Sequence, residues 1–295
     1  MSDLITTRIE ALGVLSLEER LHAVGALAED AWAAIQEGVV SEAAVGRLRQ
    51  TLVELVQADV GTGVERLPVG VLLGRIGDPR LRIPSDDDYW VELSGADVDA
   101  YRIGKYPVTN HEYRLFVDGG GYENQAHWTE EGWAWLQGTL DPWPVVADSV
   151  DTDRFLVANQ PVIGVTLHEA EAYASWAGAR LMRWAERVFA VRGEARRPYP
   201  WGSPFGEGNT NSKEEVLHRP CAVGLYVRDR KPEGVSDLAG NAGEWTLERD
   251  FSGEALLHPG SWDQPSLASW AKALTTEQPS ARWPALGFRL ARDTH

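Results

Sequence analysis

Apolar and polar positions alternate with helical spacing over the first part of the chain. Residues 21–35 carry apolar side chains every three or four positions, which is the pattern of one helical face. Ser16 and Glu19 precede them as a capping box, in which each side chain satisfies the other's free backbone amide. A second set with the same spacing covers residues 45–55, and Ser41 is placed to cap it. The pattern predicts two amphipathic helices.

These two helices form a hairpin that cannot bury both of its apolar faces alone. It must therefore pack on the rest of the chain or dock on a partner protein, and both alternatives remain open from the sequence. Residues 59–89 are mixed in character. They include an apolar segment that ends in Gly77-Asp78-Pro79, a turn sequence, and that segment is weakly similar to the end of a HEAT-like repeat unit.

The composition of the chain changes near residue 90. The sequence contains 13 tryptophans, and only Trp32 precedes residue 89. Two further helices are predicted to begin near Thr109 and Thr166, and the remainder consists of short apolar runs separated by turns. Such a pattern predicts an α+β domain with little regular secondary structure and a core of large rings. The expected organisation is a helical segment at 1–58, a helix and linker at 59–89, and a domain at 90–295.

Charge and cysteine content restrict the classes of partner. The formal net charge of −16 disfavours contact with a nucleic-acid backbone. The single cysteine, Cys221, excludes a disulfide framework within one chain. No apolar run approaches the ~20 residues of a membrane helix, and the start of the sequence lacks the pattern of a signal peptide. We therefore expect no nucleic acid, no membrane and a cytoplasmic location.

Five stretches, in order, resemble the formylglycine-generating-enzyme/sulfatase-modifying family. They lie at residues 101–122, 160–181, 199–202, 237–245 and 260–290. The segments Tyr199-Pro-Trp-Gly202 and Asp237-Leu-Ala-Gly-Asn-Ala-Gly-Glu-Trp245 show the similarity most compactly. The resemblance implies a C-type-lectin-like fold for the domain, preceded by the small helical segment.

The segment around Asn241 is a candidate calcium site. An amide, backbone carbonyls and a carboxylate lie together in Gly240, Asn241, Ala242 and Glu244, and calcium takes oxygen ligands of this kind. The alternative is that Asn241 and Glu244 only cap and tether a turn. The family resemblance favours structural calcium, and it places Asn211 and Ser212 in a second loop that binds a cation in some relatives.

This sequence has no evident ligands for the copper and iron that members of the family bind. In the copper-dependent relatives two cysteines follow the Gly-Ser-aromatic motif, and the matching positions here are Gln264 and Ser269, which do not bind copper(I). The iron-dependent relatives build a three-histidine site largely from an N-terminal helical domain, where this chain has only His22. The resemblance therefore predicts no copper, no iron and no catalytic residue.

The stretch between residues 263 and 285 differs most from the family pattern. In lectin-like folds this part forms an exposed binding face, and variable proteins of diversity-generating retroelements resemble this arrangement. Trp270 and Trp283 are the candidate anchors, because large rigid rings dominate interfaces; the alternative is burial in the core. The expected function is non-catalytic recognition of a protein partner through this face or through the N-terminal helices. The alternative is a metal-dependent oxidoreductase of the formylglycine-generating or sulfoxide synthase type.

Overall fold

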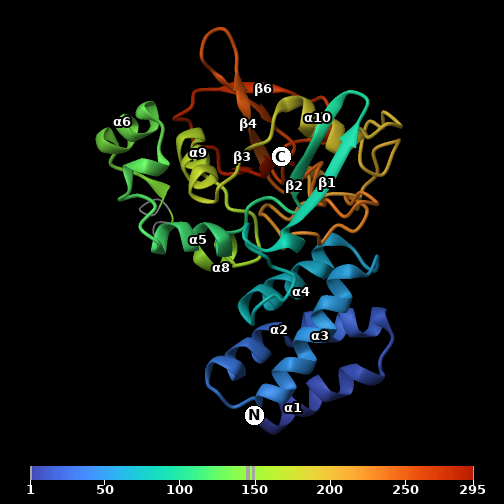
Figure 1. Cartoon of the computed structure of the whole chain (residues 1–295). Coiled ribbons are helices and arrows are strands. Elements are labelled where there is room, and N and C mark those ends of the chain that lie inside the picture. Colours follow the sequence, from blue (N-terminus) through green and yellow to red (C-terminus); the bar gives the residue numbers. More distant parts are fainter. Residues whose placement is uncertain (1, 144–146, 148–149, 295) are drawn as a thin grey trace.

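The computed structural model describes residues 2–143, 147 and 150–294. Four helices build its N-terminal part, at the lower end in Figure 1: α1 (Ser2–Ala11), α2 (Leu17–Gln36), α3 (Glu42–Gln57) and α4 (Gly63–Arg75). Ser16 and Glu19 form the predicted capping box at the start of α2, and the Ser41 hydroxyl caps α3. Both predicted helices are confirmed. They could be predicted because a capping residue lies within a few residues of the backbone amides that it satisfies.

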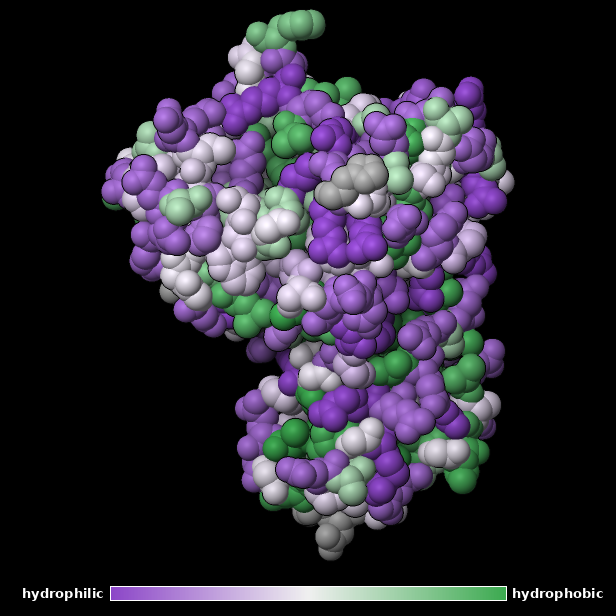
Figure 2. All heavy atoms as spheres, in the orientation of Figure 1, coloured by the Kyte–Doolittle hydropathy of each residue, from purple (hydrophilic) through white to green (hydrophobic). Residues whose placement is uncertain are grey.

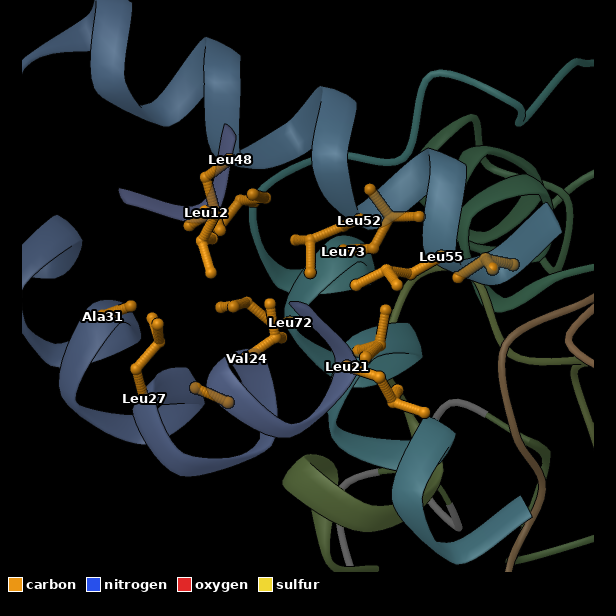
Figure 3. Close-up of a cluster of buried hydrophobic side chains, with 14 of the residues drawn as sticks. Leu12, Leu21, Val24, Leu27, Ala31, Leu48, Leu52, Leu55, Leu72 and Leu73 are labelled. Atoms are coloured by element: carbon orange, nitrogen blue, oxygen red, sulfur yellow. The ribbon is translucent and has the colours of Figure 1, made fainter. Parts of the chain in front are cut away.

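The apolar faces of these helices meet in one cluster, which Figure 3 shows. Leu21 and Val24 from α2, Leu48 and Leu52 from α3, and Leu72 from α4 are all buried in it. The cluster continues into residues from the other part of the chain: Leu217, Cys221, Leu225 and Tyr226. The helical hairpin therefore packs on the rest of the chain, which is the first of the two alternatives. Figure 2 shows the narrowing where these two parts meet.

The larger part follows a connecting segment that ends in the short helix η2 (Asp87–Tyr89). Its helices are α5 (Asn110–Asp118), η3 (Gln125–His127), α6 (Glu130–Gly138), α8 (Thr152–Phe155), α9 (Leu167–Trp176), α10 (Trp184–Arg192), η4 (Lys213–Glu215) and η5 (Ser266–Ser269). Its strands are β1 (Trp90–Gly95), β2 (Val98–Gly104), β3 (Arg180–Leu181), β4 (Gly243–Arg249), β5 (Ala255–His258), β6 (Thr275–Glu277), β7 (Leu286–Phe288) and β8 (Leu290–Asp293).

The strands in the described part of the chain form two small sheets. One has the order β1-β2-β8-β3 and the other has the order β6-β5-β4-β7. Strand β4 pairs in parallel with β7, which sets Glu244 opposite Gly287 and Trp245 opposite Phe288. The closing segment of the chain thus lies beside the motif at residues 237–245, although about 40 residues separate them in sequence.

Large rings fill the space between the helices and the sheets. Tyr113 and Phe116 from α5 contact Tyr173 from α9, and Tyr173 contacts Phe288 from β7. Capping boxes at Thr109 and Thr166 begin α5 and α9, as the sequence predicts. The α+β prediction, with short strands and an aromatic core, is confirmed.

No helix among the described residues is long and apolar enough to cross a membrane. The divisions at residues 58/59 and 89/90 stay predictions. Helix α4 lies inside the middle range and shares its buried cluster with α2 and α3.

Candidate functional site

A buried charged group lies at the centre of the larger part. Glu244 on β4 accepts a hydrogen bond from Arg289 at 2.8 Å and another from Arg187 at 3.3 Å, one on each carboxylate oxygen. All three side chains are almost completely buried. Arg187 also donates to the Leu238 carbonyl and to His258 Nδ1. Burial lowers the pKa of Arg187 to about 10, while the attraction of Glu244 acts in the opposite direction.

The loop that precedes β4 brings two of the predicted metal ligands together. Asn241 adopts a left-handed backbone conformation with φ of 71°. Its side-chain oxygen accepts hydrogen bonds from the Asn211 amide at 3.1 Å and from the Cys221 backbone amide at 2.9 Å. A Cβ at Gly240 would clash with Thr210 and with the backbone of Asn211, so only glycine allows this close approach.

The remaining predicted ligands have protein partners or contribute only backbone. The Ser212 hydroxyl donates to Glu214 at 2.7 Å, and Ala242 is buried beside the loop. Both Glu244 oxygens are held by guanidinium groups, so a cation at that carboxylate must displace at least one of them. Structural calcium at Gly240, Asn241, Ala242 and Glu244 stays a prediction, and so does a second cation at Asn211 and Ser212.

Thermal melting tests the calcium prediction. A ligand bound only by the folded state at 100 times its dissociation constant adds about 2.7 kcal/mol of stability. The predicted result is a Tm that falls in excess chelator and recovers when calcium is added. The same Tm in chelator and in calcium would contradict the prediction. The Asn211→Ala variant, which lacks a ligand of the predicted second site, should show a smaller response to calcium if that site is also occupied.

Asp237 begins the same motif and is buried with φ of 56°. Its carboxylate accepts a hydrogen bond from the Gly224 amide at 2.7 Å. Burial, followed by repulsion from Asp229, raises the pKa of Asp237 from 3.8 to about 7. The folded state therefore binds this proton more tightly than the unfolded state does, and the contribution to stability falls as pH rises from about 4 to about 7.

We expect the Asp237→Asn protein to lose part of this pH dependence. Asparagine keeps an acceptor for Gly224 and tolerates the left-handed backbone, but it carries no charge to bury. At pH 7 the free energy of unfolding of the variant should exceed that of wild type by about 1–3 kcal/mol, and this excess should shrink toward pH 4. Urea unfolding at pH 4 and pH 7 measures both values. If the unfolding free energy changes between pH 4 and pH 7 by the same amount in the variant as in wild type, the assignment is contradicted. Asp97→Asn, at an exposed position, is the control.

A cleft of about 210 Å³ opens beside the C-terminal segment. Its walls are mainly aromatic and aliphatic, with Trp143, Phe155, Ile163 and Trp283 among them. Trp283 is half-buried, whereas Trp270 is 42% exposed and does not line the cleft. The two predicted anchors therefore lie in different environments.

Among the described residues that line this cleft, Arg282 carries the charged side chain. Its guanidinium pairs with both oxygens of Glu169 at 2.8 Å. Glu169 also completes the capping box of α9 and accepts from the Trp143 amide at 2.6 Å and the Tyr122 hydroxyl at 2.9 Å. One buried carboxylate thus fixes the start of α9, the Trp143 wall and Arg282. No sequence pattern predicts this arrangement, because its parts come from separate segments with no common spacing.

Among residues 2–143, 147 and 150–294, no group of three or more His, Cys, Asp or Glu side chains is placed to hold a metal ion. His258 is buried between Arg187 and the Trp270 carbonyl, and burial lowers its pKa well below the ordinary value. Ser269, at one of the two positions matched to copper ligands, is buried as well. The residues present in the described part do not fit the copper or the iron of the family.

Comparison with known proteins identifies the domain. Residues 84–294 match the family described as Sulfatase-modifying factor enzyme 1-like domain. The chain belongs to this family. In the solved structure called Treponema denticola variable protein 1, the fold is similar with a TM-score of 0.51 at 14% identity, covering 69% of this chain and 94% of that one.

Two curated relatives are named as enzymes. The chain is 39% identical over 239 residues to the hercynine oxygenase of Mycolicibacterium smegmatis, covering 67% of this chain and 54% of that protein. It is 34% identical over 212 residues to the hercynine oxygenase of Mycolicibacterium thermoresistibile, covering 63% of this chain and 47% of that protein. The chain thus spans about half the length of these relatives.

These relatives overturn the interpretation of the chain as a non-catalytic recognition protein or pseudoenzyme. That interpretation rested on the residues at positions 264 and 269 and on the scattered histidines. The replaced cysteines exclude only copper thiolate chemistry at that segment, and they say nothing about substrate binding elsewhere in the fold. The function prediction and the leaning against an enzyme were therefore wrong, and the oxidoreductase alternative agrees better with the relatives.

Proposed function

We propose that this chain provides the substrate-binding part of a metal-dependent oxidoreductase related to the hercynine oxygenases. The substrate would be hercynine or a similar small betaine, held in the cleft beside Trp283. The similarity to two enzymes of that name, together with an aromatic cleft formed by the closing segment of the same domain, supports the proposal.

The chemistry of the cleft suits a betaine. Hercynine carries a quaternary ammonium group, and such groups bind against the faces of aromatic rings. Trp143, Phe155 and Trp283 supply rings in the walls. Arg282 is already neutralised by Glu169, so the described residues of the wall offer no uncompensated charge to repel a zwitterion.

The chain's own side chains would bind the substrate, and no step is assigned to a metal. The described residues do not assemble ligands for iron or copper. Turnover is therefore to be measured with iron(II) or copper(I) supplied in the presence of oxygen, and binding is to be measured separately without metal.

Two tryptophan substitutions distinguish this cleft from the neighbouring surface. In the Trp283→Ala protein, loss of one aromatic wall should weaken hercynine binding by at least ~2 kcal/mol, about 30-fold. The Trp270→Ala protein should bind as wild type does, because Trp270 does not line the cleft. Titration of hercynine, followed by calorimetry and by tryptophan fluorescence, measures both affinities.

Melting curves on the same two proteins control for unfolding. Hercynine that fails to bind the folded wild-type protein would contradict the proposed substrate. Equal weakening by Trp270→Ala and Trp283→Ala would contradict the placement of the site in this cleft.

A protein partner and a cytoplasmic location also stay proposals. Leu267, Trp270 and Leu274 are exposed on the C-terminal segment, which gives this face apolar groups for a protein contact. A pull-down that compares wild type with Trp270→Ala tests the contact, and retention of the same proteins by both would count against it.

A further inference from the structure

A small hollow opens between the connecting segment and the end of β2, apart from the cleft beside Trp283. It has a volume of about 10 Å³, which is room for about one water-sized group. Lys105 and Tyr106, which follow β2, line the hollow together with Arg82 from the connecting segment. None of these three side chains lines the cleft proposed for the substrate.

Two cations at this hollow have no matching anion. The Lys105 side chain is half-buried, and its ammonium lies 5.6 Å from the centre of the Tyr106 ring. The Arg230 guanidinium donates through Nε to the Ser236 hydroxyl at 3.2 Å. Neither cation forms an ion pair with a carboxylate in the described part of the chain. Two positive charges are thus left uncompensated in a chain whose formal net charge is −16.

Ser236 connects the two cations. Its backbone amide donates to the Lys105 carbonyl at 3.0 Å, and its hydroxyl accepts from Arg230. Burial lowers the pKa of Lys105, and repulsion from Arg230 is the next largest cause. Burial raises the pKa of Tyr106, and Arg230 is among the cations that act against this rise. The Arg230 guanidinium therefore lies close enough to act on both side chains that line the hollow.

The other charged groups beside the hollow are already engaged. Arg82 donates to Asp88 at 2.6 Å, and Arg80 donates to the two oxygens of Asp78 at 3.0 Å and 2.6 Å. Glu112 closes the capping box of α5, and burial raises its pKa to about 7. The main charges that act on Lys105 do not include Glu112. No carboxylate in the described part of the chain therefore offsets the two free cations.

The free donors at the hollow reach solvent. The Lys105 ammonium, the Tyr106 hydroxyl and the outer nitrogens of Arg230 have no hydrogen-bond partner among the described residues. The buried polar atoms that lack a partner include none of these groups. A ligand can therefore contact these donors without opening the fold.

We propose that this hollow binds the phosphate of a phosphate monoester. A dianion would balance Lys105 and Arg230 together, whereas a carboxylate would leave one of them unmatched. One phosphate oxygen would enter the hollow beside the Tyr106 hydroxyl, since there is room for about one water-sized group. The remaining oxygens would meet the two cations, and the ester substituent would stay outside.

Such a phosphate can belong to a free small molecule or to a phosphorylated side chain of another protein. The probes are methyl phosphate for the first source and Nα-acetyl-O-phosphoserine N-methylamide for the second. Acetate offers a single negative charge, and Nα-acetyl-serine N-methylamide offers none. Calorimetry on the whole chain at constant ionic strength and about pH 7.5, where a phosphate monoester carries nearly two charges, measures all four affinities.

We expect both phosphate esters to bind at least about tenfold more tightly than acetate. Tighter binding of the phosphoserine derivative would identify a protein side chain as the source, and tighter binding of methyl phosphate would identify a small molecule. Absence of binding by both esters, or binding of acetate as tight as that of the esters, would overturn the proposal.

Two substitutions locate the site. Lys105→Met keeps an apolar side chain of similar length and removes the charge, so it should weaken methyl phosphate binding about tenfold. Arg230→Gln removes the other free charge and should weaken binding to a similar extent. Lys213→Met is the matched control, because Lys213 is exposed on η4 and does not line the hollow.

Melting curves accompany each variant. If Arg230→Gln does not fold, the comparison of Lys105→Met with Lys213→Met decides the question alone. Equal weakening by these two variants, or equal affinity in wild type and Lys105→Met, would overturn the assignment. Hercynine binding should be unchanged in Lys105→Met, which keeps this proposal separable from that of the substrate cleft.

Discussion

The Glu244→Ala protein is expected to lose about 3–5 kcal/mol of unfolding free energy, because removal of one partner from a buried ion pair leaves uncompensated charge in the interior. Glu244 holds Arg289 on one oxygen and Arg187 on the other, and none of the three side chains reaches solvent. Arg289 also donates to the carbonyls of Gly104, Ser236 and Asp237. Loss of the carboxylate would therefore disturb both sheets and the loop at Asp237.

Urea unfolding measured against Glu131→Ala tests this expectation. Glu131 pairs with Arg249 at 2.8 Å but is 58% exposed, and an exposed pair contributes about 0–1 kcal/mol. A similar loss in both variants would contradict the central role of Glu244. Since domains are stable by only about 5–15 kcal/mol, the Glu244→Ala protein should also melt at a clearly lower temperature.

The Trp245→Ala protein is expected to lose a comparable amount, about 3–5 kcal/mol, for a different reason. Trp245 is fully buried and its indole nitrogen donates to the Val165 carbonyl at 3.0 Å. Removal of the ring leaves a cavity between β4 and the start of α9 and a carbonyl without its donor.

Trp270→Ala is the matched control for this second prediction. The Trp270 side chain is 42% exposed, and a surface substitution of this kind changes stability by about 0.5 kcal/mol or less. Chemical denaturation of the two proteins measures the difference. Equal stability of both variants would show that the core around Trp245 repacks after truncation.

The buried charges also explain why the motif at residues 237–245 gave an ambiguous sequence prediction. Asn241 and Glu244 are oxygen-bearing residues in a turn, and such residues serve equally well as metal ligands and as tethers. The partners that distinguish the two roles lie far away in sequence. Arg187 is 57 residues from Glu244, and Arg289 is 45 residues from it.

Local signals in the sequence determined the helix starts. Ser16 and Ser41 were recognisable as caps because a cap satisfies amides only two or three residues away, and helix starts were predicted near Thr109 and Thr166. All four residues cap helices in the structure. The tryptophan-rich region and the ordered motifs likewise sufficed for the family and for the α+β class. These features depend on short spacing or on composition, and both can be read along one chain.

Only the tertiary structure decided which residues form the sites. It separated Trp283, in the wall of a cleft, from Trp270 on the surface, although both lie in one stretch of sequence. It also joined Glu169 with Arg282 across 113 residues. Burial and pairing of side chains arise from contacts between distant segments, and no local pattern of residue types determines which of those segments meet.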